Sequence, residues 1–172
     1  MVDLLQVLND TYNTPWLYMV LAFGYAVLVA IVLPIPIEIA LLPPLIDQRW
    51  GYLTGTALAI AAGKTFGAFL IFVFGLNVEG SVRKWSGRWR FAAWFVNKAE
   101  KFVQKTGYTG LYLLLSIPLM SDTIPIYVYS VFNQEGKALE RNMFLIANFL
   151  AALNRVAILG AAFYIGVNWF RL

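Results

Sequence analysis

Four long apolar stretches make up most of this chain, and each contains one charged residue in its interior. The charged residues are Glu38 in residues 16–46, Lys64 in 51–76, Asp122 in 106–134 and Arg155 in 142–170. Their signs alternate along the sequence. An ionised side chain in apolar surroundings is costly unless it is paired or reaches water. Two acids and two bases so placed predict a polar centre shared between two similar halves.

The composition indicates that lipid, rather than water, surrounds most of the folded chain. Of the 172 residues, 60% are hydrophobic and 13% are charged, and the mean hydropathy is +0.70. A soluble domain has about 45–50% apolar and about 25% charged residues. We therefore expect a multi-pass protein of the cell (plasma) membrane.

The sequence contains neither histidine nor cysteine. This removes the usual general base, the commonest metal ligand and the thiol nucleophile, and it excludes serine–histidine catalysis. The Gly-x-Gly-Asp signature of intramembrane aspartyl proteases is also absent, as is any glycine-rich phosphate loop. We therefore expect no enzyme activity, no cofactor and no metal site, and any proton coupling must use carboxylates.

Prolines interrupt the first and third apolar stretches, close to the two acids. The breaks are marked by Pro34, Pro36, Pro118 and Pro125. Proline removes an amide donor and clashes with the preceding turn, so a helix stops or kinks there. Residues 16–33 and 37–46 predict the two arms of one re-entrant hairpin, and residues 110–117 and 125–132 predict those of another. Alternatively, residues 16–33 span fully, since 18 residues reach about 27 Å.

The whole pattern predicts an all-α integral membrane protein built from two inverted repeats. Each repeat, over residues 16–76 and 106–170, is a hairpin followed by one transmembrane helix. Discontinuous segments in matching positions of two halves are typical of transporter sites. Gly63 and Gly67 predict close helix packing on the first span.

Residues 77–105 join the repeats and differ from them in composition. Seven lysines and arginines stand against two glutamates, with tryptophans and phenylalanines between them. This predicts a cytoplasmic amphipathic linker that lies at the membrane surface and contacts anionic lipid headgroups. A basic segment of this kind could also bind nucleic acid, but we do not expect this function in so apolar a chain.

Half-helix ends at the two breaks can bind ions or polar groups, so the acids beside them are candidate functional residues. We expect Glu38 and Asp122 to bind protons or monovalent cations, and Lys64 and Arg155 to meet an anionic headgroup or pair with the acids. Simple neutralisation, Glu38 by Lys64 and Asp122 by Arg155, is the structural alternative. Candidate cavity-wall residues are Ser116, Ser121, Thr123, Asn148 and Asn154, which could instead be hydrogen-bond partners between helices.

Three short motifs carry a family resemblance. Residues 34–38 (Pro-Ile-Pro-Ile-Glu), 67–75 and 107–118 resemble the hairpin and helix motifs of the DedA family, also called the VTT or SNARE-associated family. The resemblance implies opposed re-entrant hairpins and movement of lipids, including polyprenyl phosphates, between leaflets. Where bacterial members carry two arginines six residues apart, this chain has Ser116 and Asp122. Residues 98–118 also resemble the putative small multidrug export proteins.

These observations favour a membrane transporter or scramblase that moves a phosphate-bearing lipid carrier, coupled to protons or cations. A proton-coupled exporter of small cationic compounds is one alternative, and a non-transporting membrane scaffold is another. A homodimer is also expected, because a small bundle walls off a cavity poorly.

Overall fold

The computed structural model describes residues 14–33, 35–86, 90–133 and 139–170, and these residues form helices and turns without a strand. The helices are α2 (Pro15–Ile31), the 3-10 helix η1 (Ile37–Leu41), α3 (Leu42–Ile46), α4 (Trp50–Ser86), α5 (Arg90–Ser116), α6 (Thr123–Val131) and α7 (Arg141–Phe170). The predicted all-α fold is therefore confirmed.

The first apolar stretch is broken where its prolines predict. α2 begins with Pro15 in its first turn, where the missing amide needs no partner. It ends at Ile31, and regular structure resumes only after Pro36, the residue that precedes η1. Pro34, the other predicted break residue, lies outside the described residues.

The third apolar stretch, residues 106–134, is broken at Pro118 but not at Pro125. α5 ends at Ser116, and α6 begins at Thr123. Pro125 is the third residue of α6, in the turn where amides have no partner within the helix. The prediction that Pro125 breaks the hairpin was wrong, because it helps to start a helix.

Gly107 divides α5 into two helical pieces. Its φ of 51° and ψ of −142° are non-helical, and L-residues with a side chain rarely adopt a positive φ. The kink falls beside residue 105, the predicted end of the basic linker. On the linker side, Trp94, Lys98 and Phe102 are exposed, and the Lys98 ammonium lies 5.0 Å from the centre of the Trp94 ring.

In the part of the chain that the structure describes, two helices are long and apolar enough to cross a membrane, over Trp50–Phe74 and Arg141–Gly166. Both match the predicted spans. α4 nevertheless continues to Ser86, beyond the predicted start of the linker at residue 77, so the first part of the linker is helical. Residues 87–89 of the linker lie outside the described residues.

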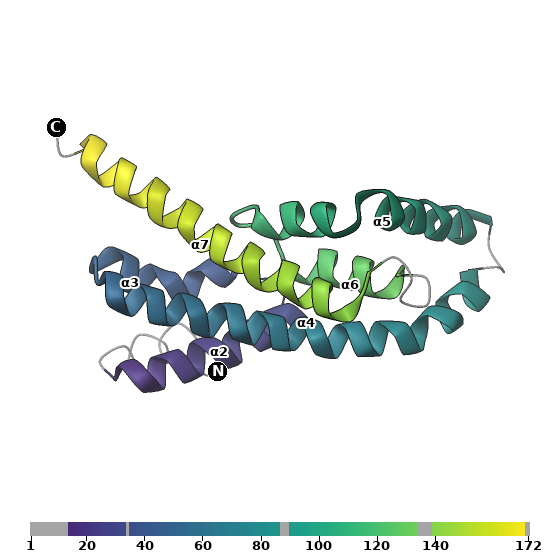
Figure 1. Ribbon diagram of the computed structural model, residues 1–172, viewed down its shortest axis with the longest axis horizontal. Coiled ribbons are helices and arrows are strands. Elements are labelled where there is room, and N and C mark those ends of the chain that lie inside the picture. The colour runs from purple at the N-terminus through teal and green to yellow at the C-terminus, as the bar shows by residue number, and fades with distance from the viewer. Residues whose placement is uncertain (1–13, 34, 87–89, 134–138, 171–172) are drawn as a thin grey trace.

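The two broken segments come toward the middle of the bundle from opposite ends (Figure 1). α2, η1 and α3 occupy one half, and α5 with α6 occupies the other. α4 runs along both halves and packs against α2, α6 and α7. α7 runs in the direction opposite to α4, so each half contains part of both long helices.

Among the described residues, two large apolar cores lie along the bundle, one mainly in each half, and a small third cluster surrounds Tyr18. The first core is formed mainly by α2, η1, α3 and the beginning of α4 as far as Ile60. The second core begins on α4 at Ala68 and includes residues of α5, α6 and α7 as far as Ala151. Lys64 lies between the two cores on α4, and Arg155 follows the second core by one turn on α7. Both bases therefore lie at the junction of the cores.

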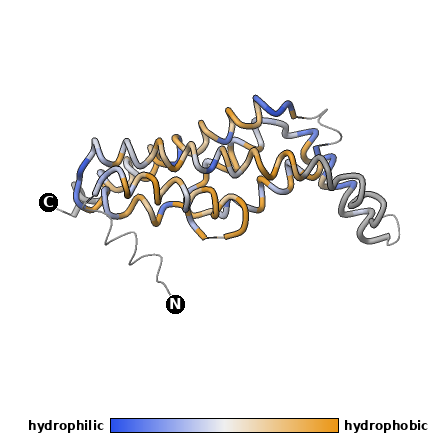
Figure 2. Tube along the Cα trace, turned by 90° about the horizontal axis from the view of Figure 1, so that it is seen from below, coloured by the Kyte–Doolittle hydropathy of each residue, from blue (hydrophilic) through white to orange (hydrophobic). Residues whose placement is uncertain are grey.

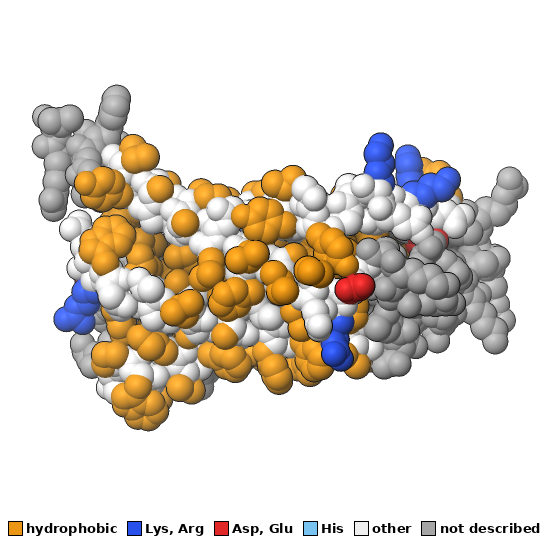
Figure 3. Space-filling view, viewed as in Figure 1, with side chains coloured by type: hydrophobic (Ala, Val, Ile, Leu, Met, Phe, Trp, Pro, Cys, Tyr) orange, Lys and Arg blue, Asp and Glu red, His pale blue; other side chains and the backbone are white. Residues whose placement is uncertain are grey.

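Large apolar side chains also cover much of the outside. Trp16, Phe74 and Ile165 are each more than 60% exposed, and many leucines and isoleucines are at least 40% exposed. Along the backbone, the middle of the bundle is mostly hydrophobic and the hydrophilic segments lie mainly toward its ends (Figure 2). Figure 3 shows the same apolar covering on one face. Apolar surface this extensive is unusual for a protein surrounded by water.

Gly63 and Gly67 bring the backbones of α2 and α4 close together. A Cβ on Gly63 would overlap the carbonyl oxygen of Phe23, and one on Gly67 would come within 2.7 Å of the Ala30 Cβ. The close packing predicted from these glycines is confirmed, with α2 as the partner.

Gly63→Ala is expected to destabilise the protein by about 1–3 kcal/mol, because the backbone of α2 must move to admit the new methyl group. Gly24→Ala on α2 is the matched control, since nothing lies within 4 Å of a Cβ there. It is expected to be neutral or to stabilise by up to about 1 kcal/mol, through helix propensity. Thermal unfolding in detergent measures both, and equal effects would contradict the packing assigned to Gly63.

Candidate functional site: a buried cluster of four charges

The four charged residues of the apolar stretches meet in one place, which we call the charge cluster. Glu38 comes from η1, Lys64 from α4, Asp122 from the residue before α6 and Arg155 from α7. Each is at most 4% exposed. Burial this complete rules out the possibility that Lys64 and Arg155 extend to the surface of the described structure.

Asp122 is the centre of the charge cluster. Its Oδ1 lies 2.8 Å from the Lys64 ammonium and 3.0 Å from Nη2 of Arg155. The other terminal nitrogen of Arg155, Nη1, lies 3.4 Å from Oε1 of Glu38. The cluster therefore balances two positive and two negative charges through a chain of contacts that runs from Lys64 through Asp122 and Arg155 to Glu38.

This pairing differs in two respects from the simple neutralisation expected within each half, Glu38 by Lys64 and Asp122 by Arg155. Asp122 does contact Arg155, but it is also the acid that hydrogen-bonds to Lys64. Glu38 contacts Arg155 instead of Lys64. The acid of each half thus contacts the base of the other half, and the charges bridge the halves rather than closing each one separately.

The charge cluster also forms hydrogen bonds with backbone groups of the second break, between α5 and α6. Leu119 has a φ of 63°, outside the helical region, and its amide donates to Oε1 of Glu38 at 2.8 Å. The next residue, Met120, accepts a hydrogen bond at 3.2 Å from Nη1 of Arg155. Two charged side chains from other elements therefore hold this break in place.

Side chains of the second half likewise form hydrogen bonds with backbone carbonyls at the first break, between α2 and η1. Thr123 donates to the carbonyl oxygen of Val29 at 2.8 Å and, at 3.3 Å, lies near that of Leu33. Tyr127, one turn later on α6, donates to the carbonyl of Ile31 at 2.9 Å. Each break is thus hydrogen-bonded by the opposite half, as irregular backbone requires when water is excluded.

Tyrosines were not among the residues that the sequence singled out. Besides Tyr127, the hydroxyl of Tyr25 donates to the carbonyl of Pro36 at 2.9 Å. The available signal was the spacing of Thr123 and Tyr127, because two hydroxyls four residues apart on the helix after a break face the same neighbour.

The charge cluster keeps buried polar atoms without a hydrogen-bond partner among the described residues. They are Oε2 of Glu38, Oδ2 of Asp122, and Nε and Nη2 of Arg155. The hydroxyl oxygens of Ser116 and Ser121, two of the candidate wall residues, also lack a partner among the described residues. Nη2 of Arg155 is close to Asp122 but not aligned for a hydrogen bond. Buried polar atoms are usually hydrogen-bonded, so unpartnered ones mark sites that can bind a further polar group.

Two further candidate wall residues, Asn148 and Asn154, lie on α7, and Oδ1 of Asn148 also lacks a hydrogen-bond partner among the described residues. Asn148 is fully buried, and its amide donates to the carbonyl of Phe144 within α7, so this hydrogen bond is not between helices. Asn154 is half-buried beside Arg155. Among the described residues, no group of three acidic, histidine or cysteine side chains is arranged to hold a metal ion.

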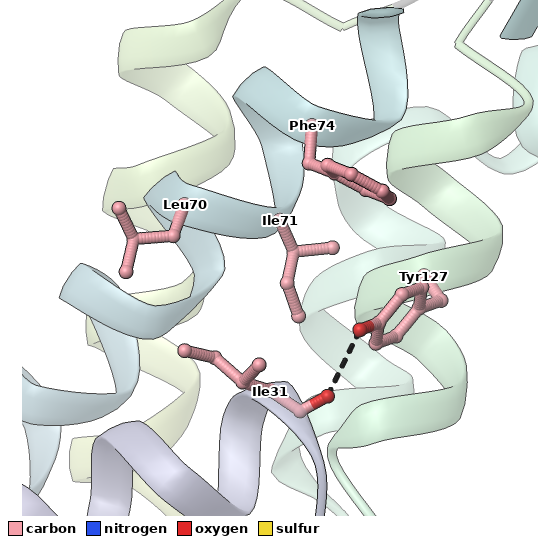
Figure 4. Close-up of a pocket in the computed structure, with 5 residues that line it drawn as sticks. All are labelled: Ile31, Leu70, Ile71, Phe74 and Tyr127. Atoms are coloured by element: carbon pink, nitrogen blue, oxygen red, sulfur yellow. Dashed lines mark hydrogen bonds between the residues drawn. The ribbon is translucent and has the colours of Figure 1, made fainter. Parts of the chain in front are cut away.

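Two surface pockets lie on either side of Lys64 along α4, and no charged residue lines either of them. One, of about 290 Å³, is formed by Ile31, Leu70, Ile71, Phe74 and Tyr127 (Figure 4). The other, of about 330 Å³, lies between the first turns of α4 and residues 153–161 in the middle of α7. The charge cluster itself is buried, and these two pockets along α4 beside it are apolar.

No protein-family model matches the chain, and neither a curated protein nor a solved structure matches it. The resemblance to the DedA family therefore rests on the short motifs of residues 34–38, 67–75 and 107–118.

Proposed function

We propose that this chain is an integral membrane transporter or scramblase that moves a phosphate-bearing lipid between leaflets. The observation that carries the proposal is the charge cluster, in which two acids and two bases meet where two broken helical segments meet. Ionisable residues within membrane-embedded segments are costly and commonly mark a transport path. The apolar outer surface and the two long apolar helices support a lipid environment.

In this proposal α4 and α7 cross the bilayer in opposite directions, and the two broken segments are re-entrant hairpins. The hairpins enter from opposite faces, as an inverted repeat requires, and the basic linker lies on the cytoplasmic side. Support comes from the mutual hydrogen bonding of the breaks, because irregular backbone at membrane depth must be buried in protein or line a wet path.

The chemistry follows from the charge balance. While both acids are ionised they satisfy Lys64 and Arg155, so the cluster has no net charge to offer an anion. A proton on either acid leaves the cluster with one positive charge, which attracts a phosphate headgroup. Arginine can bind phosphate through two parallel hydrogen bonds, and lysine adds a point charge. Proton uptake would then accompany headgroup binding.

Two other functions are each favoured by a separate observation. The unpartnered oxygens Glu38 Oε2 and Asp122 Oδ2 suit a proton-coupled exporter of small cations, although both carboxylates already contact a base. The exact balance of charge would also serve a scaffold that uses the ion pairs only to lock its helices together. Neither the exporter nor the scaffold accounts for both the unpartnered carboxylate oxygens and the balance of charge.

Glu38→Gln is expected to abolish or strongly reduce leaflet exchange of a labelled lipid phosphate in liposomes. Glutamine retains an oxygen that can accept the Leu119 amide, so the variant removes the charge and the proton site while preserving that hydrogen bond. Glu140→Gln, the same change at an exposed residue, is expected to exchange lipid like wild type.

Three outcomes separate the possible functions. Exchange by wild type and its loss in Glu38→Gln alone would support the proposal. Normal lipid exchange by Glu38→Gln would contradict the proposed role of Glu38 in proton or cation coupling. If wild type exchanges no lipid phosphate, lipid transport is contradicted, and a pH-gradient-driven cation efflux assay then distinguishes an exporter from a scaffold.

A further inference from the structure

We infer that the pocket formed by Ile31, Leu70, Ile71, Phe74 and Tyr127, here called the tail pocket, holds part of a hydrocarbon chain of the transported lipid. The inference rests on the proposed function and extends it, because it assigns the apolar end of the substrate to a particular place. The charge cluster alone could select only a headgroup.

The lining of the tail pocket suits a hydrocarbon chain. Ile71 is 3% exposed and forms the floor, whereas Leu70 and Phe74 are 41% and 61% exposed and form the rim. The only polar side-chain group of the lining is the Tyr127 hydroxyl, which already donates to Ile31 (Figure 4). A polar ligand would therefore lose hydrogen bonds on entering the pocket, and an apolar one would not.

The position of the tail pocket also fits a lipid. Leu70, Ile71 and Phe74 belong to the part of α4 that is apolar enough to span a membrane, so the rim faces the depth at which lipid chains lie. A volume of about 290 Å³ is near the lower limit of small-molecule sites, about 300–1,000 Å³, which suits a segment of one chain rather than a whole lipid.

The tail pocket lies close to the charge cluster along two helices. On α4, Leu70 follows Lys64 by six residues, a rise of about 9 Å. On α6, Tyr127 follows Asp122 by five residues, a rise of about 7.5 Å. One lipid can therefore place its chain in the pocket and its phosphate near the cluster at the same time.

The pocket is also joined to the hairpin contact. The ring of Tyr127 lines the pocket, while its hydroxyl connects α6 to Ile31, the last residue of α2. A chain that displaces the ring would loosen a hydrogen bond between the two broken segments. Occupancy of the pocket is therefore coupled to the hydrogen bond between Tyr127 and Ile31, which must break if the two hairpins move apart.

The test uses the full chain in phosphatidylcholine vesicles with a trace of phosphatidic acid that carries a photoactivatable diazirine on its acyl chain. After illumination, mass spectrometry maps the labelled residues. We expect several-fold more label on Leu70, Ile71 and Tyr127 than on Ile146 and Leu150, which are each 50% exposed on α7 and outside the pocket.

Two matched variants make the test specific. Leu70→Trp narrows the pocket and is expected to reduce labelling of Ile71 and Tyr127 several-fold, whereas Leu150→Trp is expected to leave it unchanged. Leu70→Ala widens the pocket and is expected to increase the label on Ile71 and Tyr127, which provides a second readout if Leu70→Trp folds poorly. Equal labelling of pocket and α7 residues, or no response to either Leu70 variant, would overturn the inference in favour of ordinary surrounding lipid.

Leaflet exchange measured in the same vesicles separates this inference from the proposed function. Lipid exchange without preferential labelling of the tail pocket would contradict the assignment of the pocket to a lipid chain, but it would still support lipid transport. Preferential labelling without exchange would contradict transport while supporting the pocket as a lipid-binding site.

Discussion

Asp122→Asn is expected to destabilise the protein by about 3–5 kcal/mol, more than neutralisation of Glu38. The reason is that one carboxylate oxygen of Asp122 contacts both Lys64 and Arg155. Removing its charge leaves Lys64 and Arg155, both buried, with Glu38 as their only acid in the cluster. Oε1 of Glu38 lies 3.4 Å from Nη1 of Arg155, and among the described residues Glu38 forms no ion pair with Lys64. A buried charge without its partner is among the costliest defects in a folded protein.

Thermal and denaturant unfolding in detergent would measure this effect, with Glu38→Gln and Asp47→Asn in parallel. Asp47 is exposed, and neutralising it is expected to change stability by less than about 0.5 kcal/mol. Glu38→Gln should fall between the two, because the glutamine oxygen can still accept the Leu119 amide. Comparable losses for Asp122→Asn and Asp47→Asn would show that Asp122 is not the centre of the cluster.

The sequence predicted the elements of this fold well, and the reason is physical. Proline and uninterrupted apolar length act locally, so the break at Pro118 and the two long helices could be inferred without knowing any neighbour. The alternation of charge likewise predicted that four particular side chains need partners. Local rules fail where context decides, as at Pro125, which breaks a helix in its interior but not in its first turn.

The partners themselves could not be predicted, because they depend on how distant elements pack. Nothing within either half indicates that Asp122 would contact Lys64, 58 residues away, as well as Arg155. The hydrogen bonds of Thr123 and Tyr127 to the first break cross more than 90 residues of sequence. Such contacts are set by the packing of α6 against α2 and α4, which no local pattern encodes.

The double variant Lys64→Met, Asp122→Asn is expected to recover most of the stability that either single change loses. Each single variant leaves the cluster with one unbalanced charge, whereas the double variant keeps Glu38 with Arg155 and has no net charge. Replacing a buried ion pair by uncharged groups is often neutral or stabilising, while breaking it costs about 3–5 kcal/mol. Because two losses of about 3–5 kcal/mol would be replaced by one much smaller loss, the double-mutant cycle should show a favourable coupling energy above the range of about 0.5–3 kcal/mol found for most residues in contact.

The same double variant separates a transporter from a scaffold. Lipid exchange in liposomes should remain absent even where stability has returned, because the variant lacks both the central carboxylate and one of the two cations proposed to meet the headgroup. A matched control is Lys105→Met with Asp47→Asn, which removes one charge of each sign from exposed positions and should leave exchange and stability unchanged. If instead the stable double variant exchanged lipid at the wild-type rate, Lys64 and Asp122 would serve only to hold the helices together, and transport would have to use another path.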